Sequence, residues 1–413
     1  MSDKELQQIQ DLQFADLEAA NALLKEFIIA NLDFQVETVQ IRPLAVSLNS
    51  LNGLITTADG TKYFFKTHVE PQSIINEYYN STILAEAGYP VIQPIHSSTE
   101  WGKQLLIYEF FETPSMFKVI RDLEMDRRTD ADRVISIQEK ADEQLWDIYR
   151  QTLQPLEKAA HARSPIHQLF YHRLTGGRFA NFYQGTDIFL PGGKINYNSL
   201  ASMQWNINGI QYQDTLGQLV QQAIGLLEPS RTRLRTEKSV SNAIVGHGDA
   251  HNGNLFIDVD RGSMVYFDPA FAGRHSPLLD LVKPLFHNVF AIWMYYPREI
   301  AESLSIRWEI KGDTMMVEHD FVPSPVRVAL LRSKLERVLK PLLGELSSRC
   351  MLEENWREYL KLALFCCPFL TMNLSDVKKF PPEITLLGLA MSVEMGSTSS
   401  GSMKSLLDTE LGS

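Results

Sequence analysis

The sequence has few cysteines and lacks both a long apolar run and an apolar amino-terminal signal. Its 413 residues include only Cys350, Cys366 and Cys367, with no spacing typical of a metal site. So few cysteines favour a reducing compartment. The longest apolar run, LALFCCPFL, is too short to span a bilayer, and the start, MSDKELQQIQ, has no apolar signal core. We therefore expect a cytoplasmic protein with no membrane partner.

Basic charge is also scarce. Lys and Arg number 39 against 50 Asp and Glu, which gives a formal net charge of −11. Proteins that bind nucleic acid more often carry a basic excess, so we expect no nucleic-acid partner. The chain shows no internal repeat and nothing that indicates an oligomeric state. Its 44% hydrophobic residues and its length are those of a globular protein with more than one domain.

The distribution of apolar and turn residues divides the chain into four parts. These are a leading helical segment (1–34), a β-rich module with one helix (35–112), a mostly helical part (113–395) and a flexible tail with a Gly/Ser-rich start (396–413). In the second part, two strand-like runs flank Asp59-Gly60, which is typical of a two-residue hairpin turn. A helix is expected to end at Gly88. Residues 186–212 read as irregular loop or short strands, and helices are expected from the end of a later hairpin to about residue 395.

The most unusual stretch is HGDAHNGN, which runs from His247 to Asn254 between two apolar runs. It predicts a polar loop held between strands. The runs LFIDV and SMVYF follow, with the turn-forming DRG between them. A hairpin centred on Arg261 places Asn254 and Asp268 seven residues from the centre on either side. Directly opposed residues in such a pair are neighbours, so the two side chains should face each other.

A carboxylate and an amide oxygen held side by side suit Mg²⁺, which takes one or two protein ligands and fills its shell with waters and phosphate oxygens. Asp249 lies in the loop, five residues before Asn254, and reaches the same pocket without joining the ladder. A carboxylate there is placed to accept a proton from an attacking hydroxyl. His247 and His251 are expected to order the loop through hydrogen bonds rather than to react.

The stretch HGDAHNGNLFI…YFDPAFAGRHSPLLDLV closely resembles the aminoglycoside phosphotransferase and choline kinase family of the protein-kinase-like fold. That family's pattern is matched by His247, Gly248, Asp249, His251, Asn254, Asp268 and Asp280. The resemblance implies that Asp249 is the catalytic base and that Asn254 and Asp268 hold Mg²⁺. It implies that Asp280 supports the loop. It also implies a bilobal α+β fold, with a small β-rich amino-terminal lobe and a larger, mostly helical carboxy-terminal lobe.

The same resemblance implies a nucleotide site in the amino-terminal module. A strand lysine should hold the nucleotide phosphates and a helix glutamate should orient it. Lys66 in KYFFKTH and Glu77 in INEYY fit these roles, and Lys62 is a weaker alternative for the lysine. Strand alternation places Lys66 on one face with Lys62, Phe64 and His68, and places Tyr63, Phe65 and Thr67 on the other.

LLIYEFF is expected to connect the two lobes, and the resemblance implies that backbone groups there bind adenine. The candidates are Glu109, Phe110 and Phe111. The sequence departs from protein kinases in lacking a glycine-rich loop, because Ser47–Gly53 offers only Gly53. The spacer from 113 to 243 is long and matches no recognised substrate class.

These features predict an ATP-dependent kinase that transfers a phosphoryl group to a hydroxyl of a small metabolite or an antibiotic-like acceptor, with ATP and Mg²⁺. One alternative is a metal-dependent hydrolase that uses a cluster of His247, Asp249, His251 and Asp268, since imidazole pairs favour zinc or iron. Another is a kinase-like binding module without activity. The sequence does not distinguish ATP from GTP or name the acceptor.

Overall fold

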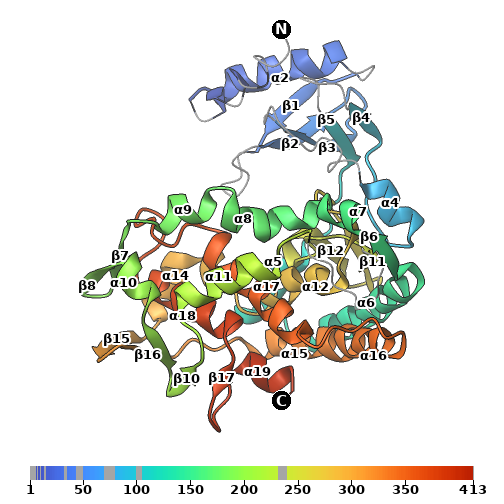
Figure 1. The fold of residues 1–413 in the computed structure, drawn as a ribbon. Coiled ribbons are helices and arrows are strands. Elements are labelled where there is room, and N and C mark those ends of the chain that lie inside the picture. The colour runs from blue at the N-terminus through green and yellow to red at the C-terminus, as the bar shows by residue number, and fades with distance from the viewer. Residues whose placement is uncertain are drawn as a thin grey trace.

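The computed structural model describes residues 6, 8–9, 11–13, 15–31, 35–42, 50–68, 80–98, 105–230 and 240–412. A small lobe built around one sheet stands on a larger lobe made mostly of helices (Figure 1). The chain starts at the far end of the small lobe and ends at the opposite end of the large lobe (Figure 1). The α+β class and the bilobal arrangement expected from the sequence are confirmed.

One antiparallel sheet forms the small lobe, with strand order β1-β2-β3-β5-β4. Its strands are β1 (Thr38–Ile41), β2 (Ser50–Thr56), β3 (Lys62–His68), β4 (His96–Ser98) and β5 (Leu105–Glu109). Helix α2 (Leu17–Asn31) covers one face of this sheet, and α4 (Ser81–Glu86) lies where the small lobe meets the large one (Figure 1). The sheet therefore has one face covered by its own helix and one face turned toward the rest of the chain.

The side chains of strand β3 alternate between the two faces of the sheet, as the sequence predicts. Phe65 is fully buried with Ile107 in the cluster that includes α2. Phe64 packs on the opposite side of the sheet, in a separate cluster with Tyr108 and Phe267. Since side chains of a strand point alternately to its two faces, Lys66 lies on the same side as Phe64 and points toward the large lobe.

The hairpin at Asp59-Gly60 joins β2 to β3, but its loop is not the expected two-residue turn. The Thr57 N–H donates to the Thr61 carbonyl (3.0 Å), so three residues, 58–60, form the loop. Asp59 Oδ1 accepts from the Thr57 hydroxyl (2.6 Å) and from the Thr61 N–H (3.0 Å). Gly60 adopts a φ of +84°. These side-chain bonds and a left-handed final glycine favour the three-residue loop over the two-residue turn.

The large lobe contains most of the helices. Those before the motif at His247–Asn254 are α5 (Met116–Glu124), α6 (Ala131–Thr152), α7 (Lys158–Ala162), η1 (Pro165–Leu169), α8 (Tyr171–Thr175), α9 (Arg178–Tyr183), α10 (Tyr197–Ala201) and α11 (Leu216–Leu226). Those from the motif onward are η2 (Asn252–Asn254), α12 (Pro277–His287), α13 (Ile292–Tyr295), α14 (Pro297–Ser303), α15 (Pro325–Lys334), η3 (Leu335–Leu339), α16 (Lys340–Ser348), α17 (Trp356–Leu370), α18 (Pro382–Gly396) and α19 (Leu406–Glu410).

Short strands accompany these helices. A three-stranded sheet contains β6 (Gln154–Glu157), β11 (Val240–Gly246) and β14 (Gly273–His275), and two hairpins are formed by β7 (Asp187–Leu190) with β8 (Gly193–Asn196) and by β12 (Leu255–Asp258) with β13 (Ser263–Tyr266). A five-stranded sheet contains β9 (Gln204–Ile207), β10 (Ile210–Tyr212), β15 (Ile306–Lys311), β16 (Thr314–His319) and β17 (Ser399–Ser400).

The hairpin β15–β16 corrects the expectation of helices alone up to residue 395. The turn between its strands contains Gly312 at a φ of +64°, and Lys311 pairs with Thr314 across it. Met315 and Val317 on β16 are buried, whereas the residues between and after them are more accessible. This period of two fits a strand with one buried face and not a helix.

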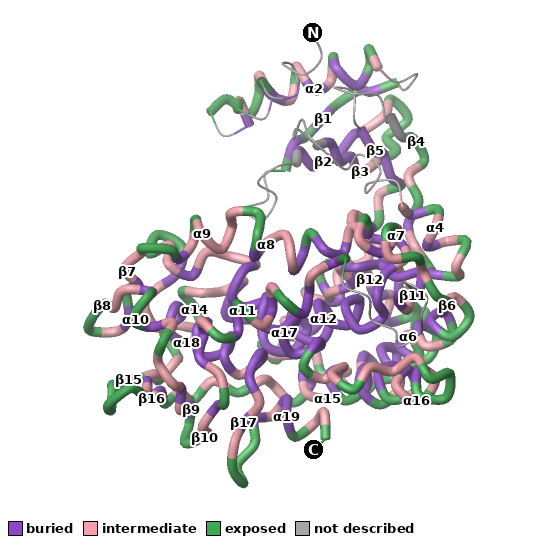
Figure 2. Tube along the Cα trace, in the orientation of Figure 1, coloured by how far each residue is buried: buried purple, intermediate pink, exposed green. Residues whose placement is uncertain are grey.

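Three helices form the centre of the large lobe. All of α12 is buried, and so is α17 from residue 359 to residue 370, while α18 is buried almost throughout (Figure 2). A helix that is apolar around its circumference belongs in a core. Among the residues described, no helix has the length and apolarity needed to cross a bilayer. The charged residues inside these helices therefore require partners, because an unpaired buried charge is costly.

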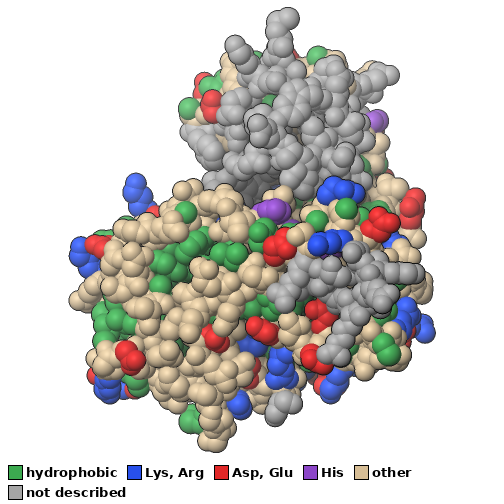
Figure 3. All heavy atoms as spheres, in the orientation of Figure 1, with side chains coloured by type: hydrophobic (Ala, Val, Ile, Leu, Met, Phe, Trp, Pro, Cys, Tyr) green, Lys and Arg blue, Asp and Glu red, His purple; other side chains and the backbone are tan. Residues whose placement is uncertain are grey.

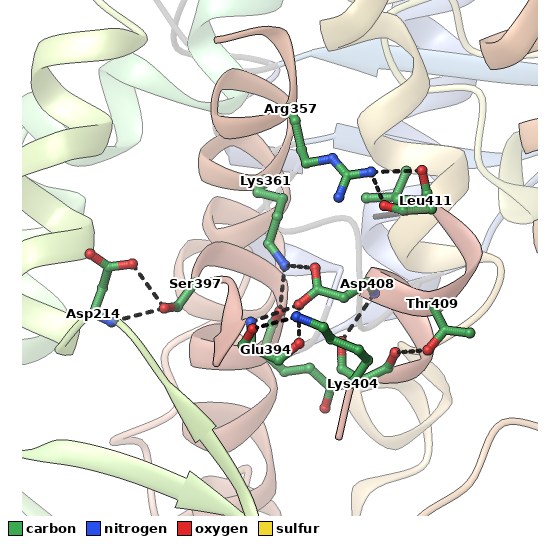
Figure 4. A network of polar contacts seen from close by, with 12 residues as sticks. Asp214, Arg357, Lys361, Glu394, Ser397, Lys404, Asp408, Thr409 and Leu411 are labelled. Atoms are coloured by element: carbon green, nitrogen blue, oxygen red, sulfur yellow. Dashed lines mark hydrogen bonds and ion pairs between the residues drawn. The ribbon is translucent and has the colours of Figure 1, made fainter. Parts of the chain in front are cut away.

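The segment after α18 was expected to be a flexible tail over 396–413, and this expectation is wrong for residues 396–412. Strand β17 pairs with β10, and Asp408 of α19 forms an ion pair with Lys361 of α17 at 2.5 Å (Figure 4). Asp408 Oδ2 also accepts from the Ser399 N–H (2.8 Å) and hydroxyl (2.6 Å). The Gly/Ser composition indicated mobility, but a buried charge on a distant helix holds this segment in place.

Candidate active site

The hairpin β12–β13 carries the end of the motif, and its register differs from the predicted one. The Phe267 N–H donates to the Asn254 carbonyl (2.9 Å), so Phe267 lies opposite Asn254. The hairpin is centred between Asp260 and Arg261. The prediction that Asp268 opposes Asn254 is therefore wrong by one residue. The loop 259–262 has an even number of residues, so no single residue lies at its centre.

Asp268 reaches the site by a different route. It follows the last paired residue and adopts a φ of +57°, a left-handed conformation that residues other than glycine seldom take. Its Oδ2 lies 2.6 Å from Nζ of Lys66. The chain thus leaves the ladder at Asp268 and turns this carboxylate toward the small lobe.

The ion pair between Lys66 and Asp268 connects the two lobes. The lysine side chain is 10% exposed and the aspartate side chain 29% exposed, so the contact is shielded but open to solvent on the aspartate side. Lys62, the alternative lysine, is exposed at the beginning of β3. The structure therefore favours Lys66 over Lys62 as the strand lysine near the motif.

Two glycines shape the start of the motif. Gly248 adopts a φ of +79°, and a Cβ there would lie 2.5 Å from the Phe271 carbonyl oxygen. A Cβ on Gly246 would lie 2.5 Å from Nε2 of His275 and 2.6 Å from Oδ1 of Asp280. The backbone of the loop therefore runs directly against its supporting residues, and a side chain at either position would push it away.

Asp280 on α12 holds this backbone. Its Oδ1 accepts from the Gly248 N–H (2.5 Å) and lies 2.8 Å from Nε2 of His275, and its Oδ2 accepts from the Tyr149 hydroxyl. Burial alone would raise the pKa of Asp280, but the hydrogen bond and charge of His275 outweigh it and lower that pKa. This placement agrees with the supporting role that the resemblance implies.

His247 and His251 both bond to the backbone of the motif. His247 is fully buried, and its Nε2 donates to the Phe267 carbonyl (2.9 Å). His251 Nδ1 accepts from the Gly253 N–H (3.0 Å) and so caps the turn η2. Burial lowers the pKa of each ring, which favours the neutral form. Both positions fit the predicted structural role.

Asp249 lies between the two histidines and is only partly buried. The Asn254 side-chain amide donates to the Asp249 backbone carbonyl (2.9 Å), which ties the two residues together. Asp249 Oδ1 accepts no hydrogen bond from any residue that the structure describes. Burial acts to raise the pKa of Asp249, but the positive charge of Lys283, with a smaller effect of His251, lowers it overall. The carboxylate is therefore ionised, and its Oδ1 is a buried oxygen 3.5 Å from Nζ of Lys283.

Lys283, which the sequence did not single out, lies one helical turn after Asp280 on α12. Its side chain is 4% exposed, and its Nζ lies 3.5 Å from Oδ1 of Asp249 and 3.3 Å from Nε2 of His287. The signal was present in PLLDLVKPLFH, where one lysine interrupts an apolar run three residues after an aspartate. Residues three apart share a helix face, and a buried lysine requires a partner.

The predicted nucleotide-binding residues are only partly placed. Glu77 and Ser47 lie outside the described residues. Gly53 lies inside β2 and not in a loop, and a Cβ there would lie 2.1 Å from the Gln40 carbonyl oxygen and 2.6 Å from the Phe65 ring. Close packing of the sheet therefore accounts for this glycine, and its expected place in a phosphate-binding loop is corrected.

The segment between the lobes leads from β5 into the large lobe. Glu109 is the last residue of β5 and pairs with Tyr63. Phe110 follows it, and the Phe111 ring stacks on the Phe256 ring of the hairpin β12–β13 at a centroid distance of 6.3 Å. The segment Glu109 to Phe111 thus runs from the sheet to the hairpin β12–β13.

The donor groups of Asn254 and Asp268 suit Mg²⁺ better than zinc or iron. Asn254 directs its amide nitrogen at the Asp249 carbonyl, which leaves its oxygen at the other end, and Asp268 adds a carboxylate. Such oxygen donors suit Mg²⁺. Within the described residues, no three or more His, Cys, Asp or Glu side chains are grouped to hold a metal ion.

Comparison of the sequence with models of protein families gives no match, and comparison with curated proteins gives none either. Similar solved structures do exist. A thermostable mutant of the aminoglycoside phosphotransferase APH(4)-Ia, in complex with AMP-PNP and hygromycin B, is 10% identical, with a TM-score of 0.48 over 90% of this chain and 98% of its own.

Two further structures are similar at the same level. An ethanolamine kinase from Plasmodium vivax is 10% identical, with a TM-score of 0.45 over 91% of this chain and 88% of its own. A macrolide 2'-phosphotransferase type I is 10% identical, with a TM-score of 0.43 over 89% of this chain and 95% of its own. All three are remote in sequence, and the substrates in their names belong to those proteins.

Proposed function

We propose that the protein is an ATP-dependent small-molecule kinase that transfers the γ-phosphoryl group of MgATP to a hydroxyl of a small acceptor. The observation that carries this proposal is the 2.6 Å contact between Lys66 of the small lobe and Asp268 of the large lobe. It lies beside the loop that presents Asp249. Phosphoryl transfer requires a cation for the nucleotide phosphates, a carboxylate for the metal and a group that orients the acceptor, and Lys66, Asp268 and Asp249 would supply them.

An aromatic layer next to this contact supports the place of the nucleotide base. Phe64 and Tyr108 from the sheet pack against Phe267, which follows the hairpin, with centroid distances of 5.7 and 5.2 Å. Phe267 in turn contacts the Phe256 ring of the hairpin at 5.7 Å. A flat apolar ring packs well against such side chains. The backbone of Glu109 to Phe111 at the edge of this layer would then bond the polar edge of adenine.

The residues around Asp268 fit a magnesium ion that accompanies the nucleotide. Asn254 and Asp268 would hold it through one amide oxygen and one carboxylate oxygen. Bound there, Mg²⁺ supplies positive charge that neutralises the phosphoryl oxygens during transfer. Lys66 binds the remaining phosphate oxygens as a point charge.

Asp249 acts on the acceptor. The acceptor oxygen attacks the γ-phosphorus, the bond from that phosphorus to the bridging oxygen breaks, and its electron pair leaves with ADP. The hydroxyl proton passes to Asp249. Because its pKa is lowered, Asp249 is ionised when the acceptor binds, so it first orients the hydroxyl by accepting a hydrogen bond. Proton transfer follows as the acceptor oxygen becomes acidic, and positioning provides most of the rate.

The experiment that tests this proposal replaces Asp249 by asparagine and measures both ADP release and nucleotide binding. We expect Asp249→Asn to lower turnover by roughly 10²- to 10⁴-fold, the range of general-base contributions, and to bind nucleotide nearly as well as the wild type. Asp147→Asn, on an exposed position of α6, is the matched control and should retain turnover. Wild-type turnover in Asp249→Asn would remove its role as base. Absence of nucleotide binding in the wild type would favour an inactive binding module.

A further inference from the structure

The loop that presents Asp249 is held by side chains from both ends of α12. Asp280, in the first turn of this helix, accepts from the Gly248 N–H (2.5 Å), just before Asp249. Asn288, the residue that caps the other end of the helix, accepts from the Asn252 N–H at its Oδ1 (2.7 Å). Since a helix rises about 1.5 Å per residue, the two anchors stand about 12 Å apart along α12. Asp249 therefore lies in the stretch of loop between two fixed points.

Asn252 relies on its backbone at the second of these points. The residue is 2% exposed, and neither end of its side-chain amide has a hydrogen-bond partner within the described residues. Its N–H bond to Asn288 is what ties it to α12. The His251 N–H donates to the Asp249 carbonyl (2.8 Å), and the Asn254 side chain donates to the same carbonyl (2.9 Å). A shift at Asn252 would therefore move both of its neighbours in the loop and, through them, Asp249.

Asn288 is itself fixed by Arg327 on α15. The Arg327 Nη1 donates to the Asn288 backbone carbonyl (2.8 Å). Nε and Nη2 of the same side chain donate to the two carboxylate oxygens of Glu124, the last residue of α5 (2.5 and 3.0 Å). The Ser324 hydroxyl also donates to Glu124 (2.7 Å). Paired bonds to one carboxylate fix the plane of a guanidinium, and so they fix the direction of the third bond, to Asn288.

The ion pair of Arg327 and Glu124 is unusual in its position. Charged side chains stand at the surface of the large lobe, as the face drawn in Figure 3 shows, but these two are only 1% and 10% exposed. Burial acts to raise the pKa of Glu124, but the hydrogen bond and charge of Arg327 lower it overall, so the pair stays ionised. A buried ion pair contributes little net stability relative to apolar packing, because desolvation offsets the attraction. Its bond to Asn288 indicates a role in placing the loop.

We propose that Asn288 and Arg327 are positioning residues for the base Asp249. Arg327, held by Glu124, orients Asn288, and Asn288 holds the loop at Asn252. This inference rests on the proposed function, because it requires Asp249 to act on an acceptor. A misplacement of about 1 Å that starts far from the chemistry can cost on the order of 10²-fold in rate, so an anchor of this kind has a measurable effect on turnover.

The first test measures ADP release from MgATP with water as the acceptor, which leaves ADP and phosphate. Only the rate that Asp249→Asn removes is counted. Asn288→Ala should lower kcat per folded molecule by roughly 10- to 100-fold and should change the KM for ATP less than kcat. Asn288→Asp retains an oxygen at the same place and should recover most of the rate. The control Asn206→Ala loses a side-chain bond to Gln211 in the sheet of β9 and β10 and should retain kcat.

A double-mutant cycle tests whether Arg327 acts through Asn288. Arg327→Lys retains the charge beside Glu124 but lacks the fork that also reaches Asn288, so it should lower kcat in the wild-type background. In the Asn288→Ala background it should lower kcat no further, because the side chain that it orients is gone. Arg332→Lys, on the same helix and paired with Glu410 at the surface, should leave kcat unchanged. Additive effects of the two substitutions would overturn the part assigned to Arg327.

Hydrogen exchange of residues 247–254 measures the anchor without turnover. Asn288→Ala should speed exchange of the Asn252 amide by roughly 2- to 10-fold, the size expected for one hydrogen bond, and Asn288→Asp should not. A role limited to stability would lower the amount of folded protein and leave kcat per folded molecule unchanged. Thermal unfolding verifies that each variant is folded at the assay temperature.

The outcomes separate this inference from the proposed function. Wild-type kcat in folded Asn288→Ala, or unchanged exchange of Asn252, would overturn the positioning role while MgATP turnover by the wild type still supports a kinase. An equal loss of kcat in Asn288→Ala and Asn288→Asp would also overturn it, because the retained oxygen would then have no effect. A wild type without ADP release that depends on Asp249 would overturn both.

Discussion

Two ion pairs of the same chemical type hold different parts of this molecule. Lys66 and Asp268 meet at 2.6 Å between the lobes, with side chains 10% and 29% exposed. Lys361 and Asp408 meet at 2.5 Å in the large lobe, with side chains 1% and 4% exposed. The distances are nearly equal, and the pairs differ in how far water and ligands can reach them.

This difference separates a pair that can exchange partners from one that cannot. Asp268 has the accessible surface and the left-handed backbone that expose its carboxylate to a ligand. Asp408 uses its second oxygen for the Ser399 N–H and hydroxyl, so its bonding capacity is filled by the protein (Figure 4). A satisfied, sealed pair stabilises a fold, whereas a shielded pair with an open side can serve chemistry. Two substitutions test this contrast and a third tests the charge beside Asp249, in order from the largest expected effect to the smallest.

The largest effect is expected for Asp268→Asn on phosphoryl transfer. Loss of this carboxylate removes the proposed metal ligand and the partner of Lys66, so turnover should fall by roughly 10³-fold or more. Its free energy of unfolding should change by no more than about 1 kcal/mol, because a partly exposed pair contributes little to stability. ADP release and denaturant unfolding measure the two quantities. If Asp268→Asn lowers the free energy of unfolding by more than it raises the activation free energy of turnover, this ion pair also stabilises the fold.

Asp408→Asn should show the opposite pattern. It leaves the Lys361 ammonium buried without its countercharge, and the free energy of unfolding should fall by about 3–5 kcal/mol. Turnover per folded molecule should stay within a factor of about two, since no contact joins Asp408 to the motif in the described residues. Urea unfolding gives the first quantity, and active-site-normalised rates give the second. An unchanged free energy of unfolding would contradict the interpretation that the buried pair of Lys361 and Asp408 stabilises the fold.

The pH dependence of the same pair has a definite sign. Burial opposes ionisation of Asp408, but the charge of Lys361 outweighs it and lowers the pKa of the carboxyl below its ordinary value of 3.8. A carboxyl with a lowered pKa stabilises the fold above its unfolded-state pKa, and that stability is lost as the pH falls through the folded-state value. As the pH is lowered from about 5, the free energy of unfolding should therefore fall more in the wild type than in Asp408→Asn.

A smaller effect is expected for Lys283→Met on the pH–rate profile. Lys283 is the main group that lowers the pKa of Asp249, so its removal should raise that pKa and move the acid limb of kcat/KM to higher pH. The Lys340→Met control removes an exposed lysine that pairs with Glu336 and should leave the limb in place. An acid limb that does not move in Lys283→Met would mean that Asp249 does not determine it.

The sequence allowed prediction of the parts of the site that are close together along the chain. The polar loop, the hairpin after it and the alternation of β3 all follow from spacing of two residues or from turn chemistry, and each is present. The identity of Lys66 as the strand lysine nearest the motif also agrees with its contact to Asp268. Local pattern is informative here because backbone geometry ties neighbouring residues to each other.

The remaining features depend on contacts between distant residues or on single-residue detail. The observed register of β12–β13 differs from the predicted one by one residue. Asp268 therefore lies beyond the ladder, and its left-handed φ angle sets the direction of its carboxylate. The pairing of β17 with β10 and of Asp408 with Lys361 links parts of the chain that composition alone suggested were unrelated. Lys283 was missed because its approach to Asp249 arises only when α12 packs against β11, the strand before the loop.

The central claim is that the shielded pair between the lobes is a magnesium–nucleotide site. The most direct measurement is thermal unfolding of the wild type, Asp268→Ala and Asp408→Asn, each with and without ATP and Mg²⁺. Ligand at about 100 times its Kd should stabilise the wild type by roughly 2.7 kcal/mol, a shift of several degrees. Asp268→Ala should lose the magnesium-dependent part of this shift, and Asp408→Asn should keep it from a lower starting Tm. A wild type that shows no shift with MgATP would contradict the account.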